Sequence, residues 1–185
     1  IPVRDIDKAK ILAEKHKAVL AGERGGAKIK GFDTGNSPID VKNFQEDVLV
    51  LTTTNGTRIL ENMSSNNILI GSFLNSQNVA SKALELAVNH IEVVMAGVNG
   101  NFAIEDFLSA GEIISYLKDG KLDETALAAM MACSNRAKVD NAVLNSNSAS
   151  GLQALGLGGD VEFCLKRNIY NTVPIYKDGI IKILK

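Results

Sequence analysis

Short apolar runs alternate with amphipathic stretches along the first part of the chain. Each apolar run is bounded by turn-forming residues, which is the pattern of a buried β-strand. Strands are predicted at residues 18–21, 48–51, 67–73 and 91–97. Apolar side chains at helical spacing predict helices at residues 6–17, 59–63, 77–89 and 105–118. This alternation favours βαβ units, so the predicted fold class is α/β, with a mixed, mainly parallel sheet and helices on both faces.

The remainder of the chain is predicted to form helices followed by a β-hairpin. Helical patterns cover residues 123–144 and 160–167, the second with Asp160 as its cap, and a short helix is expected within residues 146–159. The last two predicted strands flank Asp178-Gly179, a strong hairpin-turn signal. No linker, repeat or low-complexity tract interrupts the sequence, so residues 1–185 are predicted to form a single domain.

Composition and charge disfavour several classes of partner. The chain has 185 residues, of which 45% are hydrophobic and 22% charged, enough for a core of its own. A net charge of −1 argues against a surface for nucleic acid or membrane, and no apolar run approaches the length of a membrane span. Cys133 and Cys164 are isolated, which disfavours a zinc site or a disulfide and fits a reducing, cytoplasmic location. The expected partner is a small molecule, and a homo-oligomer is compatible with the sequence.

The polar stretch TTTNGTR, which follows the strand predicted at 48–51, is the most informative part of the chain. Unpaired backbone N–H groups at a helix start, together with hydroxyls and a glycine, can hold an anion. Arg58 adds a planar cation suited to phosphate or sulfonate. The simpler interpretation is a helix cap without any ligand. The candidate anion-binding residues are Thr53, Thr54, Asn55 and Gly56.

Two further loops carry candidate binding groups. The GERGG loop places Glu23 and Arg24 among glycines, so that the backbone of Gly25 and Gly26 can approach a ligand closely, although a flexible turn with a surface ion pair explains it equally well. The loop at 31–38 contributes Asn36 and Ser37. Ligands of parallel α/β sheets bind beyond the carboxyl ends of the strands, so the polar loops that follow the four predicted strands are expected to cluster.

Three carboxylates are candidates for a metal site. Glu23 lies in the GERGG loop, and Glu105 and Asp106 lie in the first turn of the helix predicted to end near residue 118. Mg²⁺ prefers carboxylate oxygens and commonly takes one or two of them, with waters and substrate oxygens completing its shell. The simpler interpretation of Glu105 and Asp106 is that they complement the dipole of that helix.

Five motifs occur in a fixed order along the chain. They are AGERGG at 21–26, GFDTGNSP at 31–38, TTTNGTR at 52–58, GSFLN at 71–75, and AG…FAIED…AG at 96–111. This series resembles the 2-phosphosulfolactate phosphatase family of coenzyme M biosynthesis, and residues 151–179 are similar to the end of that family's sequences. The resemblance covers essentially the whole chain.

The resemblance implies a Mg²⁺-dependent phosphatase that hydrolyses 2-phosphosulfolactate to 3-sulfolactate and phosphate. The catalytic candidates are Glu23, Arg24, Arg58 and Asp106, and the metal candidates are Glu23, Glu105 and Asp106. The substrate-binding candidates are Gly25, Gly26, Asn36, Ser37, Thr53, Thr54, Asn55 and Gly56. No covalent nucleophile stands out, so the hypothesis is attack by a metal-activated water, with Glu23 or Asp106 as ligand or base.

The chain departs from the family pattern at its start. The family begins with a strand and a helix that carry an Asp-Val-Leu-Arg-Ala motif, and nothing in this sequence matches it, so this unit is expected to be missing. Two other functions stay open. One is a phosphatase for other 2-phospho-hydroxyacids, and the other is a non-catalytic protein that binds anions.

Overall fold

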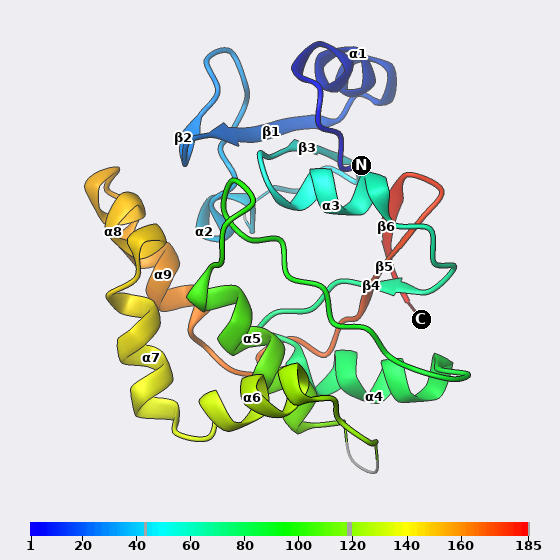
Figure 1. Ribbon diagram of the computed structural model, residues 1–185. Coiled ribbons are helices and arrows are strands. Elements are labelled where there is room, and N and C mark those ends of the chain that lie inside the picture. The colour runs from blue at the N-terminus through cyan, green and yellow to red at the C-terminus, as the bar shows by residue number, and fades with distance from the viewer. Residues whose placement is uncertain (43, 118–119, 185) are drawn as a thin grey trace.

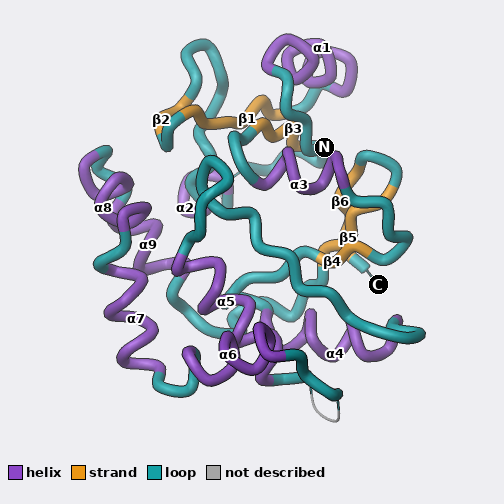
Figure 2. The backbone as a smooth tube through the Cα atoms, viewed as in Figure 1, coloured by secondary structure: helices purple, strands orange, loops and turns teal. Residues whose placement is uncertain are grey.

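The computed structural model describes residues 1–42, 44–117 and 120–184 and shows an α/β fold with two small sheets (Figure 1). The strands are β1 (Val19–Arg24), β2 (Ala27–Lys28), β3 (Leu49–Thr52), β4 (Ile68–Leu69), β5 (Pro174–Lys177) and β6 (Ile180–Ile183). The helices are α1 (Ile6–His16), α2 (Pro38–Val41), α3 (Gly56–Asn62), α4 (Ser76–Leu86), α5 (Ile104–Ser115), α6 (Glu124–Ala132), α7 (Arg136–Leu144), α8 (Asn147–Ala154) and α9 (Gly158–Cys164). The strands gather in two places, and long loops run between them (Figure 2).

The first sheet has the strand order β2-β1-β3. β1 and β3 run parallel, with Gly22 opposite Thr52, while β2 returns antiparallel to β1. The prediction of α1 is confirmed: the Asp5 carboxylate accepts the N–H of Lys8 at 2.7 Å and caps the helix, and Ala9 is buried in the core that α1 shares with this sheet. The parallel pair brings the carboxyl ends of β1 and β3 together at one edge.

The second sheet has the order β4-β5-β6 and is antiparallel throughout. Its β5–β6 hairpin confirms the predicted C-terminal hairpin. Asp178 and Gly179 both have positive φ, 50° and 78°, which suits a two-residue turn whose twist matches that of the strands. β4 pairs with β5 through Ile68 opposite Tyr176, and it is much shorter than the strand predicted at 67–73.

The predicted α/β class and a mixed sheet are confirmed, but the sheet is not mainly parallel. Among the described residues, β1 and β3 are the one parallel pair of strands, supplemented by single parallel bridges from Pro2 to Leu51 and from Ala21 to Thr34. The strand predicted at 91–97 is also wrong. These residues form no strand and cross between α4 and α5 as a loop, with Val94 and Met95 exposed by 45% and 36% (Figure 2). An apolar run indicates strand propensity, but a strand also needs a neighbour for its backbone hydrogen bonds.

A second core joins α5, α7, α8 and α9 to the loop after β4 (Figure 1). α5 lies against α6 so closely that a Cβ on Gly111 would stand 2.1 Å from the carbonyl oxygen of Ala129. The predicted helix at 123–144 is two helices, α6 and α7, because Asn135 caps the second by accepting the N–H of Lys138 at 3.1 Å. Asp160 lies in the first turn of α9 instead of capping it. The buried side chains of this core are Phe73, Leu108, Val139, Val143, Ala149, Val161 and Leu165.

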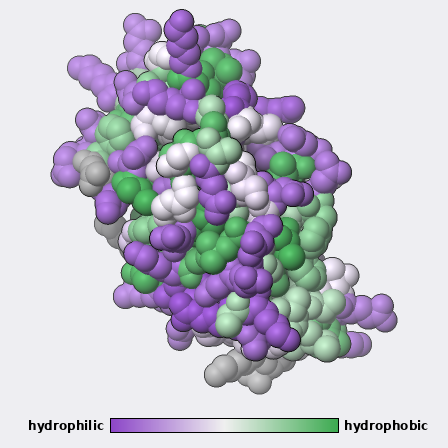
Figure 3. Space-filling model, turned by 90° about the vertical axis from the view of Figure 1, so that its left-hand side faces the viewer, coloured by the Kyte–Doolittle hydropathy of each residue, from purple (hydrophilic) through white to green (hydrophobic). Residues whose placement is uncertain are grey.

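The face turned to the viewer in Figure 3 is mixed, with hydrophilic residues surrounding smaller hydrophobic patches. Among the described residues, no helix combines the length and the apolar character needed to cross a membrane. That residues 1–185 form a single domain stays a prediction.

Candidate active site

Glu23, near the end of β1, joins two of the predicted binding loops. Its side chain is 92% shielded, since the residue is only 8% exposed, and both carboxylate oxygens accept backbone N–H groups. Oε1 accepts from Thr54 at 2.8 Å, and Oε2 accepts from Gly26 at 2.9 Å. Gly26 can make this turn because its φ is +83°, which glycine adopts without strain. The structure therefore places the GERGG loop beside the start of TTTNGTR, as the parallel pairing of β1 and β3 requires.

The loop between β3 and α3 is capped from within. The Thr53 hydroxyl accepts the N–H of Thr57 at 3.5 Å, and the Thr57 hydroxyl donates to the Thr53 carbonyl at 2.7 Å. Asn55 is the N-cap residue of α3 but makes no side-chain cap hydrogen bond, so the Thr53 hydroxyl is the group that accepts an N–H of the first turn. This frees the Thr54 and Asn55 side chains for other contacts.

Several donors in this loop have no partner among the described residues. The Thr54 hydroxyl oxygen is buried without a hydrogen bond, and the backbone N–H groups of Asn55 and Gly56 are also unpaired there. No carboxylate in the described part of the chain forms an ion pair with Arg58. A buried polar atom without a partner is costly, and the donors here suit an anion.

A third loop connects the TTTNGTR loop, which we call the cradle, to the acidic start of α5. The side-chain oxygen of Asn55 accepts the backbone N–H of Asn99 at 3.0 Å, and the Asp106 carboxylate accepts the N–H of Gly97 at 2.8 Å. Both contacts fall on the turn at residues 97–101, although no strand precedes this turn. A continuous series of hydrogen bonds therefore runs from Gly26 through Glu23, the TTTNGTR loop and the 97–101 turn to Asp106.

Glu105 and Asp106 face a pocket of about 160 Å³, whose other walls include the loop Ser72-Phe73-Leu74. Burial raises the pKa of Asp106, and the charge of Glu105 raises it further, against the backbone hydrogen bonds from Gly97 and Ala96. Two adjacent carboxylates in a partly desolvated setting would be stabilised by a cation.

The structure does not gather Glu23, Glu105 and Asp106 into one metal site. No group of three or more His, Cys, Asp or Glu side chains is arranged to hold a metal within the described residues. Glu23 already uses both carboxylate oxygens on backbone N–H groups. The residues therefore fit a divalent ion held by Glu105 and Asp106 with waters and substrate oxygens, and they do not fit a three-carboxylate site.

Arg24 is tied to the framework of the first sheet. Its guanidinium donates to the carbonyl oxygens of Glu23 at 2.7 Å and Arg4 at 2.8 Å, and to the Thr52 hydroxyl at 2.9 Å. The Thr52 hydroxyl in turn donates to the Arg4 carbonyl at 3.0 Å. Three of the five guanidinium N–H donors are thus used within the protein, which leaves two for a ligand.

Asn36 and Ser37 line a separate pocket of about 350 Å³ together with Gly26, Lys28 and Asp40. The Ser37 hydroxyl donates to the Asp160 carboxylate at 2.7 Å and accepts the N–H of Asp40 at 3.3 Å. Since its one O–H donor is engaged, Ser37 has none left for an anion in this conformation. Gly26 is shared between this pocket and the Glu23 contact, whereas neither the TTTNGTR loop nor Asp106 lines it.

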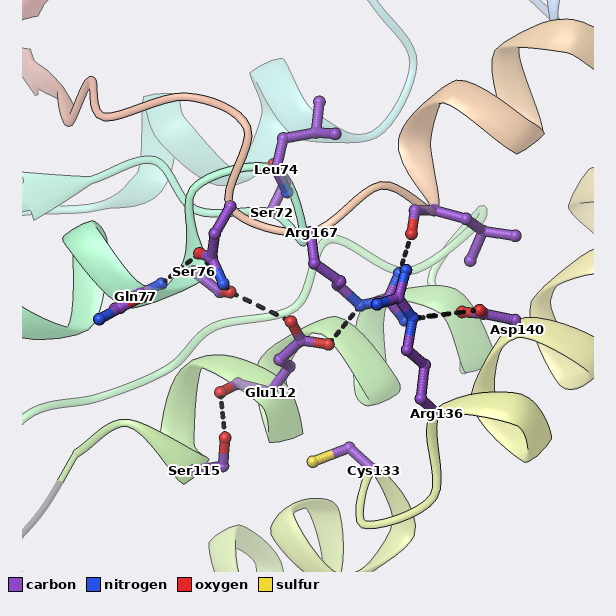
Figure 4. A network of polar contacts seen from close by, with 12 residues as sticks. Ser72, Leu74, Ser76, Gln77, Glu112, Ser115, Cys133, Arg136, Asp140 and Arg167 are labelled. Atoms are coloured by element: carbon purple, nitrogen blue, oxygen red, sulfur yellow. Dashed lines mark hydrogen bonds and ion pairs between the residues drawn. The ribbon is translucent and has the colours of Figure 1, made fainter.

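Arg167 forms a buried ion-pair network with Glu112 and Asp140 that the sequence does not predict (Figure 4). These residues lie far apart in the chain and form no motif. From its neighbours in the sequence, Arg167 is expected to be an ordinary polar residue at the end of a short helix. The partners of a single buried arginine cannot be found from spacing, so no signal in the sequence could have located this network.

The chain matches known proteins over nearly its whole length. The model of the 2-phosphosulpholactate phosphatase family matches residues 1–179. A 2-phosphosulfolactate phosphatase from Methanothermobacter thermautotrophicus is 52% identical over 185 residues, which cover 100% of this chain and 80% of that relative. A probable 2-phosphosulfolactate phosphatase from Clostridium novyi is 39% identical, covering 94% of this chain and 77% of its own. A protein from Thermotoga maritima with the same description is 37% identical, covering 97% and 79%. The chain therefore belongs to the 2-phosphosulfolactate phosphatase family.

Proposed function

We propose that this protein is a phosphoric monoester hydrolase that converts 2-phosphosulfolactate and water to 3-sulfolactate and phosphate. Family membership supports the reaction, and one structural observation supports the location of the site. That observation is the series of hydrogen bonds from Gly26 through Glu23, Thr54, Asn55 and the 97–101 turn to Asp106. It joins a set of anion donors to a pair of carboxylates.

In this proposal the TTTNGTR loop binds the phosphoryl group. The Thr54 hydroxyl and the backbone N–H groups of Asn55 and Gly56 are donors without partners among the described residues, and Arg58 supplies a cation. The substrate carries phosphate, sulfonate and carboxylate on a small skeleton, so a protein of net charge −1 must bind it through such local donors. The remaining donors of Arg24 and the backbone N–H of Gly25 are assigned to the other anionic groups. The Gly26 N–H is already bonded to Glu23, and Asn36 lines the separate pocket, so neither is assigned to this substrate.

Glu105 and Asp106 are the residues that would hold Mg²⁺. When bound, this ion supplies positive charge to the phosphoryl oxygens and to the leaving oxygen. Glu23 is assigned a different role from the ligand role that its position in the sequence suggests. Its two backbone contacts hold the Thr54 N–H and the glycine turn in place, which orients the donors around the substrate.

The reaction requires cleavage of the bond between phosphorus and the ester oxygen. Water provides the new oxygen on phosphorus, and its proton passes to the departing alkoxide, so no residue is consumed. Because Asp106 is assigned to the ion, its role is to orient the attacking water, and no side chain is assigned to hold the proton between the two events. A phosphorylated Asp, Ser or Thr trapped during turnover would refute this direct mechanism.

The test is phosphate release from a panel of matched substrates. 2-Phosphosulfolactate, 2-phospholactate and phosphoglycolate would each be assayed with Mg²⁺ and with a chelator. We expect Mg²⁺-dependent release that is fastest with the sulfonate. The Arg58→Met variant should lose activity, while Arg136→Met, which removes a mostly exposed arginine on α7, should behave like wild type. Equal rates of phosphate release from substrates with and without the sulfonate would favour another 2-phospho-hydroxyacid as substrate. No release from any substrate would contradict the proposed function.

A further inference from the structure

Arg167 is a buried arginine that links three separate parts of the helical half of the molecule (Figure 4). Its side chain is 10% exposed. Nε donates to the Glu112 carboxylate on α5 at 2.5 Å, and Nη2 donates to the Asp140 carboxylate on α7 at 2.8 Å. Nη1 donates to the carbonyl oxygen of Leu165, just after α9. One planar guanidinium therefore fixes α5, α7 and the end of α9 relative to one another.

Arg167 also holds the loop that follows β4. Its Cζ atom lies 3.8 Å from the centre of the Phe73 ring, and Phe73 is 5% exposed. The next residue, Asn168, donates its backbone N–H to the Phe73 carbonyl at 3.0 Å, and its side-chain oxygen accepts the N–H of Gln77 at 2.8 Å. Arg167 and Asn168 therefore hold the Phe73 loop by stacking and a main-chain hydrogen bond, and Asn168 also holds the first turn of α4.

The acidic pair lies on the same helix as Glu112. Glu112 lies seven residues after Glu105, about two helical turns, so the two residues lie along one side of α5. The other oxygen of Glu112 accepts the hydroxyl of Ser76, at the start of α4, at 3.3 Å. Because Ser72, Phe73 and Leu74 face Glu105 and Asp106 across one pocket, Arg167 connects the two walls of that pocket.

The energetics favour a geometric role for this network. Replacing a buried ion-pair network with well-packed apolar side chains often leaves stability unchanged or improves it, because the desolvation of the charges offsets their attraction. Stability alone therefore does not account for a buried arginine with two carboxylates. A rigid planar donor with fixed partners does hold neighbouring elements at a defined separation.

We infer that Arg167 is a positioning residue of the phosphatase site, which holds the Phe73 loop against the Glu105–Asp106 edge through Glu112 and Phe73. The inference rests on the proposed function, because it takes Glu105 and Asp106 as the residues that hold the divalent ion. Residues that orient metal ligands without touching the metal typically contribute 10-fold to 100-fold to affinity or activity.

The test compares Arg167→Met with Arg136→Met. Arg136 is the matched control, because it pairs with the same Asp140 at 3.6 Å but is 68% exposed and contacts neither Glu112 nor Phe73 among the described residues. Mn²⁺ affinity without substrate would be measured by electron paramagnetic resonance, and kcat and KM by phosphate release. For Arg167→Met we expect Mn²⁺ affinity at least about tenfold weaker, with a raised KM, and for Arg136→Met a change below about twofold. Arg167→Lys, which keeps the charge but loses the fork, should fall between them.

The outcomes separate the possible failures. A folded Arg167→Met protein with the Mn²⁺ affinity and KM of Arg136→Met would overturn the inference, even if its melting temperature were lower. If Arg167→Met does not fold, Glu112→Gln takes its place, because it keeps the size of the side chain but removes the charged acceptor of the Arg167 Nε donor. Weaker Mn²⁺ affinity with a raised KM is then expected, and values equal to those of Arg136→Met would overturn the inference. If the wild type binds Mn²⁺ at Glu105 and Asp106 but hydrolyses none of the substrates, the proposed function fails while the Mn²⁺ comparison still tests Arg167.

Discussion

The substitution Glu23→Gln discriminates between a residue that binds metal and one that holds two loops together. The Glu23 carboxylate accepts two backbone N–H groups, from Thr54 at 2.8 Å and Gly26 at 2.9 Å. Glutamine is nearly the same shape, but it has one acceptor oxygen, and its NH₂ group would face the second backbone N–H. One buried donor is therefore left without a partner, and the other hydrogen bond loses its charged acceptor.

The expected cost follows from these two contacts. Losing one hydrogen bond to a charged group and weakening the other should reduce the free energy of unfolding by about 2–4 kcal/mol. For a chain of 185 residues this corresponds to a melting temperature lower by roughly 4–16 °C. Activity should fall as well, because the Thr54 N–H and the glycine turn are released from their positions beside the proposed substrate site.

The assay is thermal unfolding without metal, run beside phosphate release. Glu61→Gln is the control, because Glu61 is exposed and accepts a single backbone N–H, from Arg4 at 3.1 Å, so its change should stay within about 0.5 kcal/mol. A metal ligand predicts the opposite behaviour for Glu23→Gln, namely lost activity with unchanged stability. A melting temperature equal to that of the wild type, with activity abolished, would refute the loop-holding role.

Three further substitutions test other parts of the site. Thr54→Val removes a buried hydroxyl oxygen that has no partner among the described residues, so the metal-free protein should be as stable as the wild type or up to about 1 kcal/mol more stable, while phosphate release falls. Thr52→Val loses hydroxyl contacts to Arg4 and Arg24 and should instead lower the free energy of unfolding by about 1–3 kcal/mol. Equal losses of stability in the two variants would contradict the unpaired state of the Thr54 hydroxyl. In Asp106→Asn the acceptor for the Gly97 N–H is kept. Because burial and then the charge of Glu105 raise the pKa of Asp106 above 3.8, the wild type loses stability as the pH rises from there through the raised pKa. The variant should lack this loss, melt no lower than the wild type at neutral pH, and be inactive. A clearly lower melting temperature of the variant at neutral pH would show that ionised Asp106 stabilises the fold. Asn55→Ala detaches the 97–101 turn from the TTTNGTR loop and should reduce kcat/KM at least about tenfold, with a change in unfolding free energy of about 0.5–1.5 kcal/mol. Asn145→Ala, at the C-cap of α7, is the control for loss of an exposed asparagine contact. Full activity in Asn55→Ala would separate this turn from the site.

Elements with strong local signals were predictable from the sequence. The Asp5 cap and the amphipathic pattern after it define α1, and Asp178-Gly179 defines the hairpin turn between β5 and β6. The polar loops around Glu23 and Thr54 also lie together as expected, because β1 and β3 are parallel neighbours. In these cases the residues that determine the structure are close in sequence or follow directly from one strand pairing.

Features that depend on distant partners were not predictable. Residues 91–97 have the composition of a buried strand, yet no strand of the described chain pairs with them, and β4 pairs with the C-terminal hairpin instead of extending the first sheet. The Ser37–Asp160 contact joins residues 123 positions apart, and the partners of Arg167 come from α5, α7 and the loop after β4. Local pattern carries no information on such pairings, which tertiary packing decides.

The roles assigned to the candidate site residues remain predictions, although the structure changes their grouping. Glu105 and Asp106 line one pocket, while Glu23 holds the GERGG and TTTNGTR loops together through Gly26 and Thr54. Asn36 and Ser37 face a different pocket, where Ser37 is already bonded to Asp160. The candidate site therefore has two parts, the TTTNGTR loop and the acidic pair Glu105–Asp106, which the 97–101 turn joins, instead of one cluster of loops at the ends of four strands.

The most direct test of this arrangement is the anomalous diffraction of crystals grown with Mn²⁺, as a substitute for Mg²⁺, and phosphate. We expect a Mn²⁺ peak beside the carboxylates of Glu105 and Asp106, with phosphate bound to the Thr54 hydroxyl and Arg58. A Mn²⁺ peak in the other pocket, beside Asp40, or phosphate bound away from the TTTNGTR loop, would contradict it.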